Sequence, residues 1–424
     1  MARIYQELLE LDKENRPIRL GIIGAGQMGQ GLVAQLSTVP GMALMAICDH
    51  NLDRIELAVK NYKRLSGRDS DIVQDTDFRT ICRSKEVDLV VDATGTTEGG
   101  AEIAYECLLQ GKHLVLLNVE VDITIGPLMH KLFDQAGLIY TGSNGDEPAE
   151  TFKLFEFAKT MGMEVLVAGK GKNNKINYGA NPETCREEAE ARGMNPRMLA
   201  SFKDGTKTMA EMNLLANATG FLPDIPGMHG ITGGEEETLK DLRTKEEGGI
   251  LSQYGIVEYV DGLAPGVFVI AKAQNEWVQD ELNYMMKKDG DHFLFYRPFH
   301  LGSLETPITI AKAILHDQMA ITPLPGGPVA ETVCVAKKDL KAGEELDGMG
   351  GFCLRGLVES HEDLVQGGHV PFGIIAGKSK MVRSIKAGQI LTRDDVEVDP
   401  TTTIYRLRAL QDSTFAMNLG ALDD

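Results

Sequence analysis

The sequence predicts an α/β protein: a Rossmann-type doubly wound parallel sheet, an α+β substrate and dimerisation insert, and a small β-rich C-terminal domain. Three observations predict this. Short apolar runs alternate with helical segments from residue 18 to 169, as in a parallel sheet with helices on both faces. A glycine-rich turn joins the first run to the first helix. The alternation stops near residue 170, and the pattern changes again near residue 328.

The predicted strands of this sheet are nearly continuous runs of Val, Leu and Ile, which is typical of strands buried on both faces. They lie at residues 18–23, 43–48, 88–93, 113–118, 138–142 and 164–169. Helical segments separate them, for example at 28–37, 98–110 and 147–161. Residues 2–14 precede the first strand and have the periodicity of a short amphipathic helix.

The rest of the chain follows a different pattern. We expect helices over 183–217, strands over 251–271 and 292–298, and a helix near 303–316 that packs back on the first domain. The strands over 251–271 are candidates for pairing in a homodimer or a larger homo-oligomer. Two loosely similar segments containing Lys-Ala-Gly then predict the β-rich tail. The expected divisions are 1–16 (N-terminal helix), 17–162 (dinucleotide-binding domain), 163–327 (substrate-binding domain) and 328–424 (tail).

Composition limits the partners of the chain. Of 424 residues, 43 are Lys or Arg and 62 are Asp or Glu, a net charge of −19. Such a chain is repelled by nucleic acids and by anionic membranes. Six scattered cysteines without a Cys/His cluster fit a reduced compartment and no structural zinc. The charged N-terminal segment does not resemble a signal peptide, and no apolar stretch reaches 18 residues, so we expect a cytoplasmic protein.

The glycine-rich turn is the most informative motif. Gly24, Gly26 and Gly29 form a G-x-G-x-x-G pattern between a strand and a helix that begins near Gln27 and Met28. The first glycine permits the tight turn, the second lets the backbone approach a pyrophosphate, and the third allows close packing of the helix. The helix N-terminus offers free N–H groups to the phosphates. The pattern therefore predicts NAD or NADP binding.

Asp49 lies 20 residues after Gly29, at the end of the second predicted strand. An acidic side chain there accepts hydrogen bonds from the adenosine ribose, which favours NAD. Arg54 is close enough in sequence to bind the 2′-phosphate of NADP, so the choice of coenzyme stays open.

Two further strand ends carry polar residues. Because the carboxyl ends of parallel strands meet at the ligand-binding edge of such a sheet, we expect these residues along the nicotinamide half of the coenzyme. They are Thr94, Gly95 and Thr96 after one strand, and Asn118 and Glu120 after the next.

The segment Gly169-Lys170-Gly171-Lys172-Asn173-Asn174-Lys175 concentrates three lysines in an acidic chain. We interpret it as a tight loop whose ammonium and amide groups bind an anion or polarise an oxyanion. Lys170 and Lys172 are the catalytic candidates, and Asn173 and Asn174 the substrate-binding ones. The alternative is a solvated basic turn.

Other polar residues are candidates with structural alternatives. Ser143, Asp146 and Glu147 follow a strand end, where Glu147 also suits a helix cap. Glu211 and Asn213 lie on one predicted helix and need partners if buried. His300 is an acid/base candidate because an imidazole titrates near neutral pH, although it also suits a helix cap. Two further substrate-binding candidates are His229, in a glycine-rich loop, and Arg297, beside His300.

On these residues the chain resembles known families. The pattern GIIGAGQMGQGLV, ICD, VVDATG and LNVE is similar to the coenzyme domain of homoserine dehydrogenase over about 150 residues. The segment from Lys338 to Gly343 resembles a turn of the SAF domain. Together with GKGKNN, these features resemble the deoxyxylulose-phosphate reductoisomerase-like oxidoreductases, which are homoserine dehydrogenase-like proteins with a SAF tail.

The resemblance implies an NAD(P)-dependent enzyme acting on a small, polyhydroxylated, anionic substrate. In its narrow form it implies reductoisomerisation of 1-deoxy-D-xylulose 5-phosphate to 2-C-methyl-D-erythritol 4-phosphate, a step of isoprenoid biosynthesis. It then also implies a divalent metal, Mg²⁺ or Mn²⁺, for which Asp146, Glu147 and Glu211 are the candidate ligands. Two alternatives remain: an NAD-dependent sugar-acid dehydrogenase or oxidoisomerase, and a non-catalytic regulatory protein that responds to nucleotide.

Overall fold

A computed structural model describes residues 3–69 and 71–419 of the chain. Contacts divide it into two compact units. The first holds the chain up to Asp146, Leu301–Pro325 and the segment from Leu407 onward; the second holds Glu147–His300 and Gly326–Arg406. The boundary between the two units therefore lies between Asp146 and Glu147, whereas the sequence analysis expected it between residues 162 and 163. The difference arises because the helix that begins at Glu147 packs on the second sheet.

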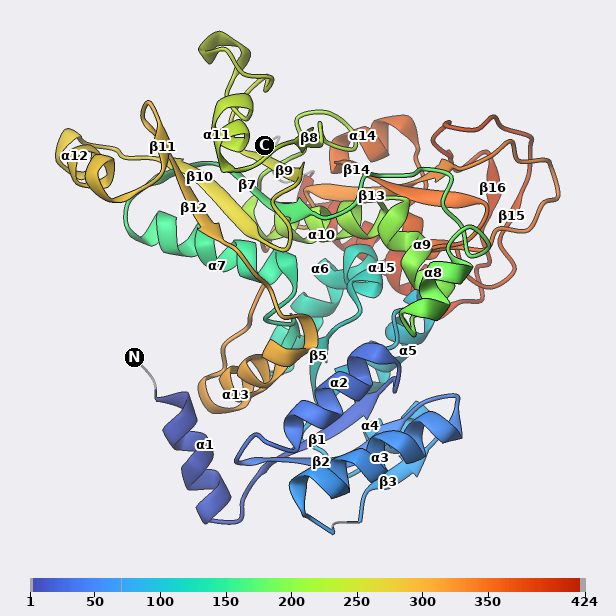
Figure 1. Ribbon diagram of the computed structural model, residues 1–424. Coiled ribbons are helices and arrows are strands. Elements are labelled where there is room, and N and C mark those ends of the chain that lie inside the picture. Colours follow the sequence, from blue (N-terminus) through green and yellow to red (C-terminus); the bar gives the residue numbers. More distant parts are fainter. Residues whose placement is uncertain (1–2, 70, 420–424) are drawn as a thin grey trace. The chain divides into compact units, whose positions relative to one another are not determined.

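The first unit contains a six-stranded sheet with the order β3-β2-β1-β4-β5-β6, and neighbouring strands are parallel. This is the strand order of a doubly wound dinucleotide-binding sheet, so the predicted fold class is confirmed. The strands are β1 (Ile18–Ile23), β2 (Met42–Cys48), β3 (Val73–Asp75), β4 (Leu89–Asp92), β5 (His113–Leu116) and β6 (Tyr140–Gly142). Figure 1 labels β1, β2, β3 and β5 of this sheet.

Helices of the first unit connect and cover these strands. They are α1 (Ile4–Lys13), α2 (Gln27–Leu36), α3 (Leu52–Ser66), α4 (Phe78–Arg83), α5 (Thr97–Leu109), α6 (Val119–Gln135), the 3₁₀ helix η2 (Gly302–Glu305) and α13 (Thr306–His316). Helix α13 contacts α1 and β5, and His316 Nε2 lies 2.9 Å from Glu7 Oε2 on α1. The final helix, α15 (Thr403–Leu419), enters this unit at Leu407, where Gln411 accepts the backbone N–H of Leu128.

The second unit contains a mixed six-stranded sheet with the order β11-β12-β10-β7-β9-β8. Its strands are β7 (Glu164–Lys172), β8 (Ile231–Thr232), β9 (Ile256–Asp261), β10 (Val267–Lys272), β11 (Lys288–Asp289) and β12 (His292–Arg297). Its helices are α7 (Glu147–Thr160), α8 (Arg186–Ala191), α9 (Pro196–Lys203), α10 (Thr206–Thr219), α11 (Glu235–Asp241), the 3₁₀ helix η1 (Lys245–Glu247) and α12 (Glu276–Met285).

The prediction that residues 164–169 belong to the parallel sheet is wrong. They form β7, which pairs antiparallel with β10 and parallel with β9 in the second sheet. The apolar run is continuous because β7 is buried on both faces. Val165 and Ala168 pack in one core cluster, and Leu166 and Val167 pack in another.

The tail of the chain packs with the second sheet over most of its length. Strands β13 (Ala330–Ala336) and β14 (Leu354–Ser360) form an antiparallel pair that contacts α10. They are followed by α14 (His361–Gly367), the 3₁₀ helix η3 (Phe372–Ile374) and the short pair β15 (Lys380–Met381) and β16 (Val396–Glu397). A SAF domain stays a prediction for this segment.

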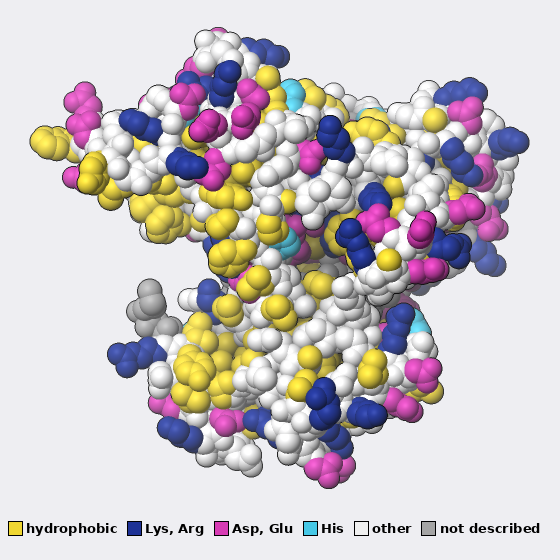
Figure 2. Space-filling view, viewed as in Figure 1, with side chains coloured by type: hydrophobic (Ala, Val, Ile, Leu, Met, Phe, Trp, Pro, Cys, Tyr) yellow, Lys and Arg dark blue, Asp and Glu magenta, His cyan; other side chains and the backbone are white. Residues whose placement is uncertain are grey.

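Two surface features bear on the expected partners. Within the described residues, every helix is too short or too polar to cross a membrane. Hydrophobic side chains project from α12 at the edge of the second unit (Figure 2), where Trp277 and Tyr284 are 85% and 93% exposed. The expected homo-oligomer stays a prediction.

Candidate functional site

The glycine turn between β1 and α2 has two positions that admit no side chain. Gly24 has φ +101°, and a Cβ atom there would lie 2.6 Å from the backbone of Ala93. A Cβ atom at Gly29 would lie 1.9 Å from the carbonyl oxygen of Gly24. The turn and the close approach of the helix therefore both require glycine, as the motif predicts.

Gly26 is different, because a Cβ atom there would meet nothing within 4 Å. It is the N-cap residue of α2, and no side chain caps the helix at this end. The first backbone N–H groups of α2, including those of Gln27 and Met28, are thus available beside open space. Free amides and the positive end of the helix dipole favour a phosphate here.

Asp49 connects the end of β2 to the glycine turn. Its carboxylate accepts the backbone N–H of Ala25 at 2.7 Å and that of Asn51 at 2.9 Å. The side chain is half-buried, at the position where a Rossmann domain binds the ribose. Arg54 lies in the first turn of α3, where its backbone N–H is capped by Asn51.

The ends of β4 and β5 are joined by one hydrogen-bond network. The Asn118 amide donates to Asp92 at 2.9 Å, to Thr94 Oγ1 at 3.2 Å and to the carbonyl of Thr96 at 2.9 Å. Burial raises the pKa of the Asp92 carboxyl to about 6. Gly95, with φ +69°, makes the turn. This network fixes the shape of the loop after β4. Glu120, another predicted coenzyme-binding residue, is buried in the first turn of α6.

The second unit holds a buried cluster of one lysine and two carboxylates. Lys170 on β7 forms ion pairs with Glu211 on α10 and, at 2.6 Å, with Glu147 at the start of α7. The three side chains are 6%, 2% and 13% exposed, respectively. Burial opposes the charge on Lys170, but the two carboxylates outweigh burial and raise its pKa. The lysine is therefore held in its protonated form.

His300 extends this cluster, since its Nε2 atom lies 3.4 Å from Glu147 Oε1. Arg297, three residues earlier, pairs instead with the buried Glu150 on α7. Glu147 and His300 are the first and last residues of one of the two segments that form the second unit.

The basic segment is not a loop, which corrects the sequence interpretation. Lys170 and Lys172 lie within β7. The glycines between them permit close approach of other strands and loops: a Cβ atom at Gly169 would lie 2.0 Å from the carbonyl of Glu258, and one at Gly171 would lie 2.2 Å from Leu263. Asn173, which is exposed, and Asn174 follow the strand.

Lys172 is buried, and its ammonium donates to the carbonyl oxygen of Phe202 at 3.0 Å. Burial and the neighbouring charge of Lys170 lower its pKa. The two lysines of β7 therefore differ in proton affinity. Lys170 retains its proton, and Lys172 releases one more easily than an ordinary lysine does.

Three predicted ligand residues are engaged in structural contacts. Asn213 donates to Thr332 at 3.0 Å and accepts from Asn217 at 2.7 Å, which joins α10 to β13. The Ser143 hydroxyl is buried against Thr306, at 2.9 Å. His229 Nε2 lies 2.7 Å from Asp224, outside the Lys170 cluster. Each of these side chains already has a protein partner, so these contacts stabilise the fold.

The carboxylates proposed as metal ligands are also engaged. Lys170 Nζ lies between Glu147 and Glu211, so an ammonium supplies the positive charge that a cation would bring. Asp146, Glu147 and Glu211 each place one carboxylate oxygen within 4.8 Å of the other two, so the structure brings the three predicted ligands together. Three carboxylates are a donor set that suits Mg²⁺ or Mn²⁺, but the charged ammonium of Lys170 already pairs with two of them.

Two residues of these sites were not predicted from the sequence. Asp92 organises the loop after β4, and Glu150 pairs with the side chain of Arg297. For Asp92 a signal existed, since a charged residue inside the apolar run VVDA requires a partner once buried. Glu150 gave no such signal, because its partner is 147 residues away and a helix of this composition carries many acids.

Two family matches fall on these two groups of residues. Residues 24–137 match the family described as "Homoserine dehydrogenase, NAD binding domain", which includes the glycine turn and Asp49. Residues 145–306 match "Oxidoreductase DRL, catalytic domain", which includes Lys170, Glu211 and His300. Neither match includes the tail.

Curated relatives cover a small part of the chain. Glycosyl hydrolase family 109 protein 4 of Phocaeicola vulgatus is 29% identical over 100 residues, 23% of this chain and 19% of the relative. Glycosyl hydrolase family 109 protein 2 of Shewanella sp. (strain ANA-3) is 32% identical over 123 residues, 28% of this chain and 25% of the relative. The alignments thus span about a quarter of these relatives or less.

Solved structures share low identity with this chain. A probable dehydrogenase from Thermotoga maritima aligns with a TM-score of 0.42 and 15% identity, over 71% of this chain and 90% of that one. KijD10, a 3-ketoreductase from Actinomadura kijaniata solved with NADP, gives 0.37 and 13%, over 72% and 91%. The glycine turn, the strand order and the two family matches together support an NAD(P)-dependent oxidoreductase.

Proposed function

We propose that this protein transfers hydride between a nicotinamide coenzyme and a small, polyhydroxylated, anionic substrate. In this proposal the first unit binds the coenzyme, and the Lys170 cluster of the second unit binds the reacting carbonyl or carbinol. The single observation that carries the proposal is the buried, protonated Lys170 between Glu147 and Glu211. Burying a charge costs free energy, and buried charges with shifted pKa values concentrate at functional sites. Lys170 also lies within a segment that matches an oxidoreductase catalytic domain.

The coenzyme, when bound, supplies or accepts the hydride. Lys170 then acts on the oxygen of the reacting carbon. In the direction of reduction, its ammonium donates a hydrogen bond to the carbonyl oxygen and passes a proton to the alkoxide as the hydride arrives at carbon. His300, through its contact with Glu147, returns a proton from solvent to the cluster. In the direction of oxidation the same proton moves the opposite way.

Glu147 and Glu211 position the ammonium and keep it charged before reaction. Because neither carboxylate touches the substrate in this scheme, we assign them as positioning residues. The curated relatives are named as glycosyl hydrolases, which supports a carbohydrate-like substrate. An NAD-dependent sugar-acid dehydrogenase and a reductoisomerase of 1-deoxy-D-xylulose 5-phosphate both belong to this substrate class.

The position of Lys170 favours plain hydride transfer over reductoisomerisation. Rearrangement of a ketose phosphate calls for a divalent metal that binds the carbonyl and hydroxyl oxygens together. In this protein the neighbouring carboxylates are paired with an ammonium instead. We therefore expect that a chelator leaves turnover unchanged.

Replacing the ammonium tests the proposal. Lys170→Met keeps the length of the side chain and removes its charge, and Lys175→Met is the matched control because Lys175 is exposed on the same segment. We expect turnover to fall by at least about 100-fold in Lys170→Met, with unchanged affinity for NADH or NADPH. Equal turnover in both variants would refute the role of Lys170. Coenzyme binding without turnover of any substrate by the wild-type protein would favour a regulatory function.

A further inference from the structure

A second group of basic side chains lies around the junction between α9 and α10. Lys172 comes from the end of β7, Lys337 follows β13, and Arg355 lies on β14. Asp204, at the end of α9, interacts electrostatically with all three. We call Lys172, Lys337 and Arg355 the cationic cluster. All of its members belong to the second unit.

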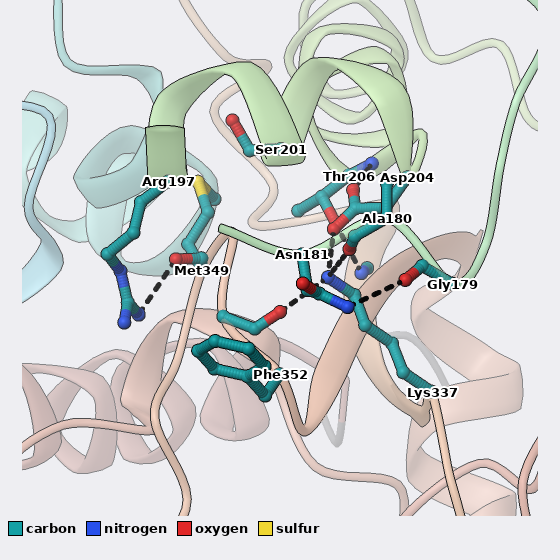
Figure 3. A network of polar contacts seen from close by, with 12 residues as sticks. Gly179, Ala180, Asn181, Arg197, Ser201, Asp204, Thr206, Lys337, Met349 and Phe352 are labelled. Atoms are coloured by element: carbon teal, nitrogen blue, oxygen red, sulfur yellow. Dashed lines mark hydrogen bonds and ion pairs between the residues drawn. The ribbon is translucent and has the colours of Figure 1, made fainter. Parts of the chain in front are cut away.

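Lys337 has a full set of partners and forms the fixed part of the cluster. Its ammonium lies 2.6 Å from Asp204 and donates to the carbonyl oxygens of Ala180 and Gly351, both at 2.7 Å. Figure 3 shows this lysine reaching between Ala180 and Asp204. An ammonium has three N–H donors, so Lys337 has none left for a ligand.

Arg355 is not satisfied in this way. Its guanidinium lies over the ring of Tyr178, with 3.9 Å from Cζ to the ring centroid. Its Nη1 atom is buried and has no hydrogen-bond partner among the described residues. A buried, unpaired N–H of a charged group is strongly unfavourable. In a folded protein the missing acceptor is an ordered water or a ligand.

Lys172 also has capacity for a ligand. Only one acceptor, the carbonyl oxygen of Phe202, lies within hydrogen-bond distance of its ammonium among the described residues. Three carboxylates act on this ammonium, those of Glu211, Asp261 and Asp204. Two members of the cluster, Lys172 and Arg355, therefore keep N–H donors that the described residues do not satisfy.

The register of β7 relates this cluster to Lys170. Lys170 and Lys172 are two residues apart on one strand, so their side chains project from the same face, with Cα atoms about 6.6 Å apart. Lys170 acts at one end of the substrate, and the cationic cluster is available at the other.

We propose that Lys172 and Arg355, with Tyr178 against the guanidinium, bind the anionic end of the substrate, a phosphate or a carboxylate. The proposal rests on the proposed function, since it treats Lys170 as the reacting end. It assigns a role to the tail of the chain: Arg355 comes from β14, beyond both segments that match known families. The tail would then select anionic substrates over neutral ones.

Titration calorimetry with inorganic phosphate, and separately with malonate, tests this on the full chain without coenzyme. We expect the wild-type protein to bind at least one of these anions. Arg355→Gln and Lys172→Gln should weaken that binding by at least about tenfold, because each removes a charge-assisted hydrogen bond. Lys175→Gln, which removes an exposed lysine three residues from Lys172, should bind as the wild type does.

The outcomes separate this proposal from the role of Lys170. Lys170→Met should still bind the anion. If this variant loses turnover but keeps anion binding, the result supports both the role of Lys170 in turnover and the role of the cationic cluster in binding. Equal anion affinity in the wild type, Arg355→Gln and Lys175→Gln would overturn the proposal that the cationic cluster binds an anion. No binding of either anion by the wild type would also overturn it. If Arg355→Gln does not fold, Tyr178→Leu is the substitute, since Tyr178 is 51% exposed and its loss removes only the stacking contact. Weaker binding in that variant supports the proposal, and unchanged binding overturns it.

Discussion

Lys170 on β7 and Glu211 on α10 form an ion pair from which water is almost completely excluded. The two residues are 41 positions apart in sequence, and only the packing of α10 against the second sheet brings them together. A pair this deeply buried contributes little net stability, because desolvation offsets the attraction of the charges. Its consequence is chemical, since it keeps a protonated amine inside the protein.

Glu211→Gln should change the pH dependence of the reaction. Removing the carboxylate charge leaves Glu147 as the remaining partner of Lys170, so the raised pKa of the ammonium falls. In the direction of reduction, a protonated lysine is required, and activity is lost as pH rises through its pKa. We therefore expect the alkaline limb of the kcat/KM profile to move to lower pH in Glu211→Gln. An unchanged limb would contradict the positioning role.

Gly26 and Gly29 should respond differently to substitution. At Gly26 there is room for a side chain, so Gly26→Val should fold normally and lose coenzyme affinity by about 100-fold, because the side chain occupies the phosphate position. At Gly29 a Cβ atom collides with Gly24, so Gly29→Ala should lower the melting temperature. Thermal unfolding and fluorescence titration with NADH distinguish the two effects. Equal stability of both variants would contradict this interpretation.

Asp49 should set the coenzyme preference. A carboxylate at the ribose position accepts hydrogen bonds from the hydroxyls of NADH and repels the 2′-phosphate of NADPH. We expect the wild type to prefer NADH, and Asp49→Ser to weaken NADH binding while improving NADPH binding. The ratio of the two dissociation constants is the measurement. A wild-type preference for NADPH would point to Arg54 as the determining residue.

Glu258 should make stability depend on pH. This buried carboxylate on β9 accepts the backbone N–H groups of His229, Gly230 and Tyr259, and burial raises its pKa from 4.5 to about 7. Because the folded-state pKa is the higher one, its stabilising contribution is complete below pH 4.5 and is lost as pH rises through about 7. The shift corresponds to about 3 kcal/mol of unfolding free energy.

Urea unfolding of the wild type and Glu258→Gln at about pH 5 and about pH 8 measures this contribution. The wild type should lose more stability than the variant between these two values, because glutamine does not titrate. Parallel losses in both proteins would show that other groups, such as the buried Asp92 and Asp122, control the pH dependence.

Local sequence patterns predicted the first unit well. The bounds of β1 and the roles of Gly24, Gly26 and Gly29 depend on apolar runs and backbone sterics, which neighbouring residues determine. The short edge strand β3 was missed, because its three residues, Val73–Asp75, have no apolar run.

The candidate site of the second unit could be predicted only in part. The sequence identified Lys170, Glu147, Glu211 and His300 as separate polar candidates. It did not predict that the ammonium of Lys170 pairs with both carboxylates. The placement of Lys170 in a strand depends on pairing with β9 and β10, whose paired residues lie 89 and 97 positions downstream of Lys170. Such contacts are tertiary, and a local sequence pattern does not predict them.

Transfer of deuterium from the coenzyme to a product tests directly whether this protein transfers hydride with the help of Lys170. Wild-type protein is incubated with NADH or NADPH deuterated at the transferable position of the nicotinamide, together with keto sugars, keto sugar acids and 1-deoxy-D-xylulose 5-phosphate. The products are analysed by mass spectrometry, with Lys170→Met in parallel. We predict one deuterium in a reduced product from the wild type and none from Lys170→Met. Coenzyme binding without deuterium in any product, or equal transfer by both proteins, would contradict the account.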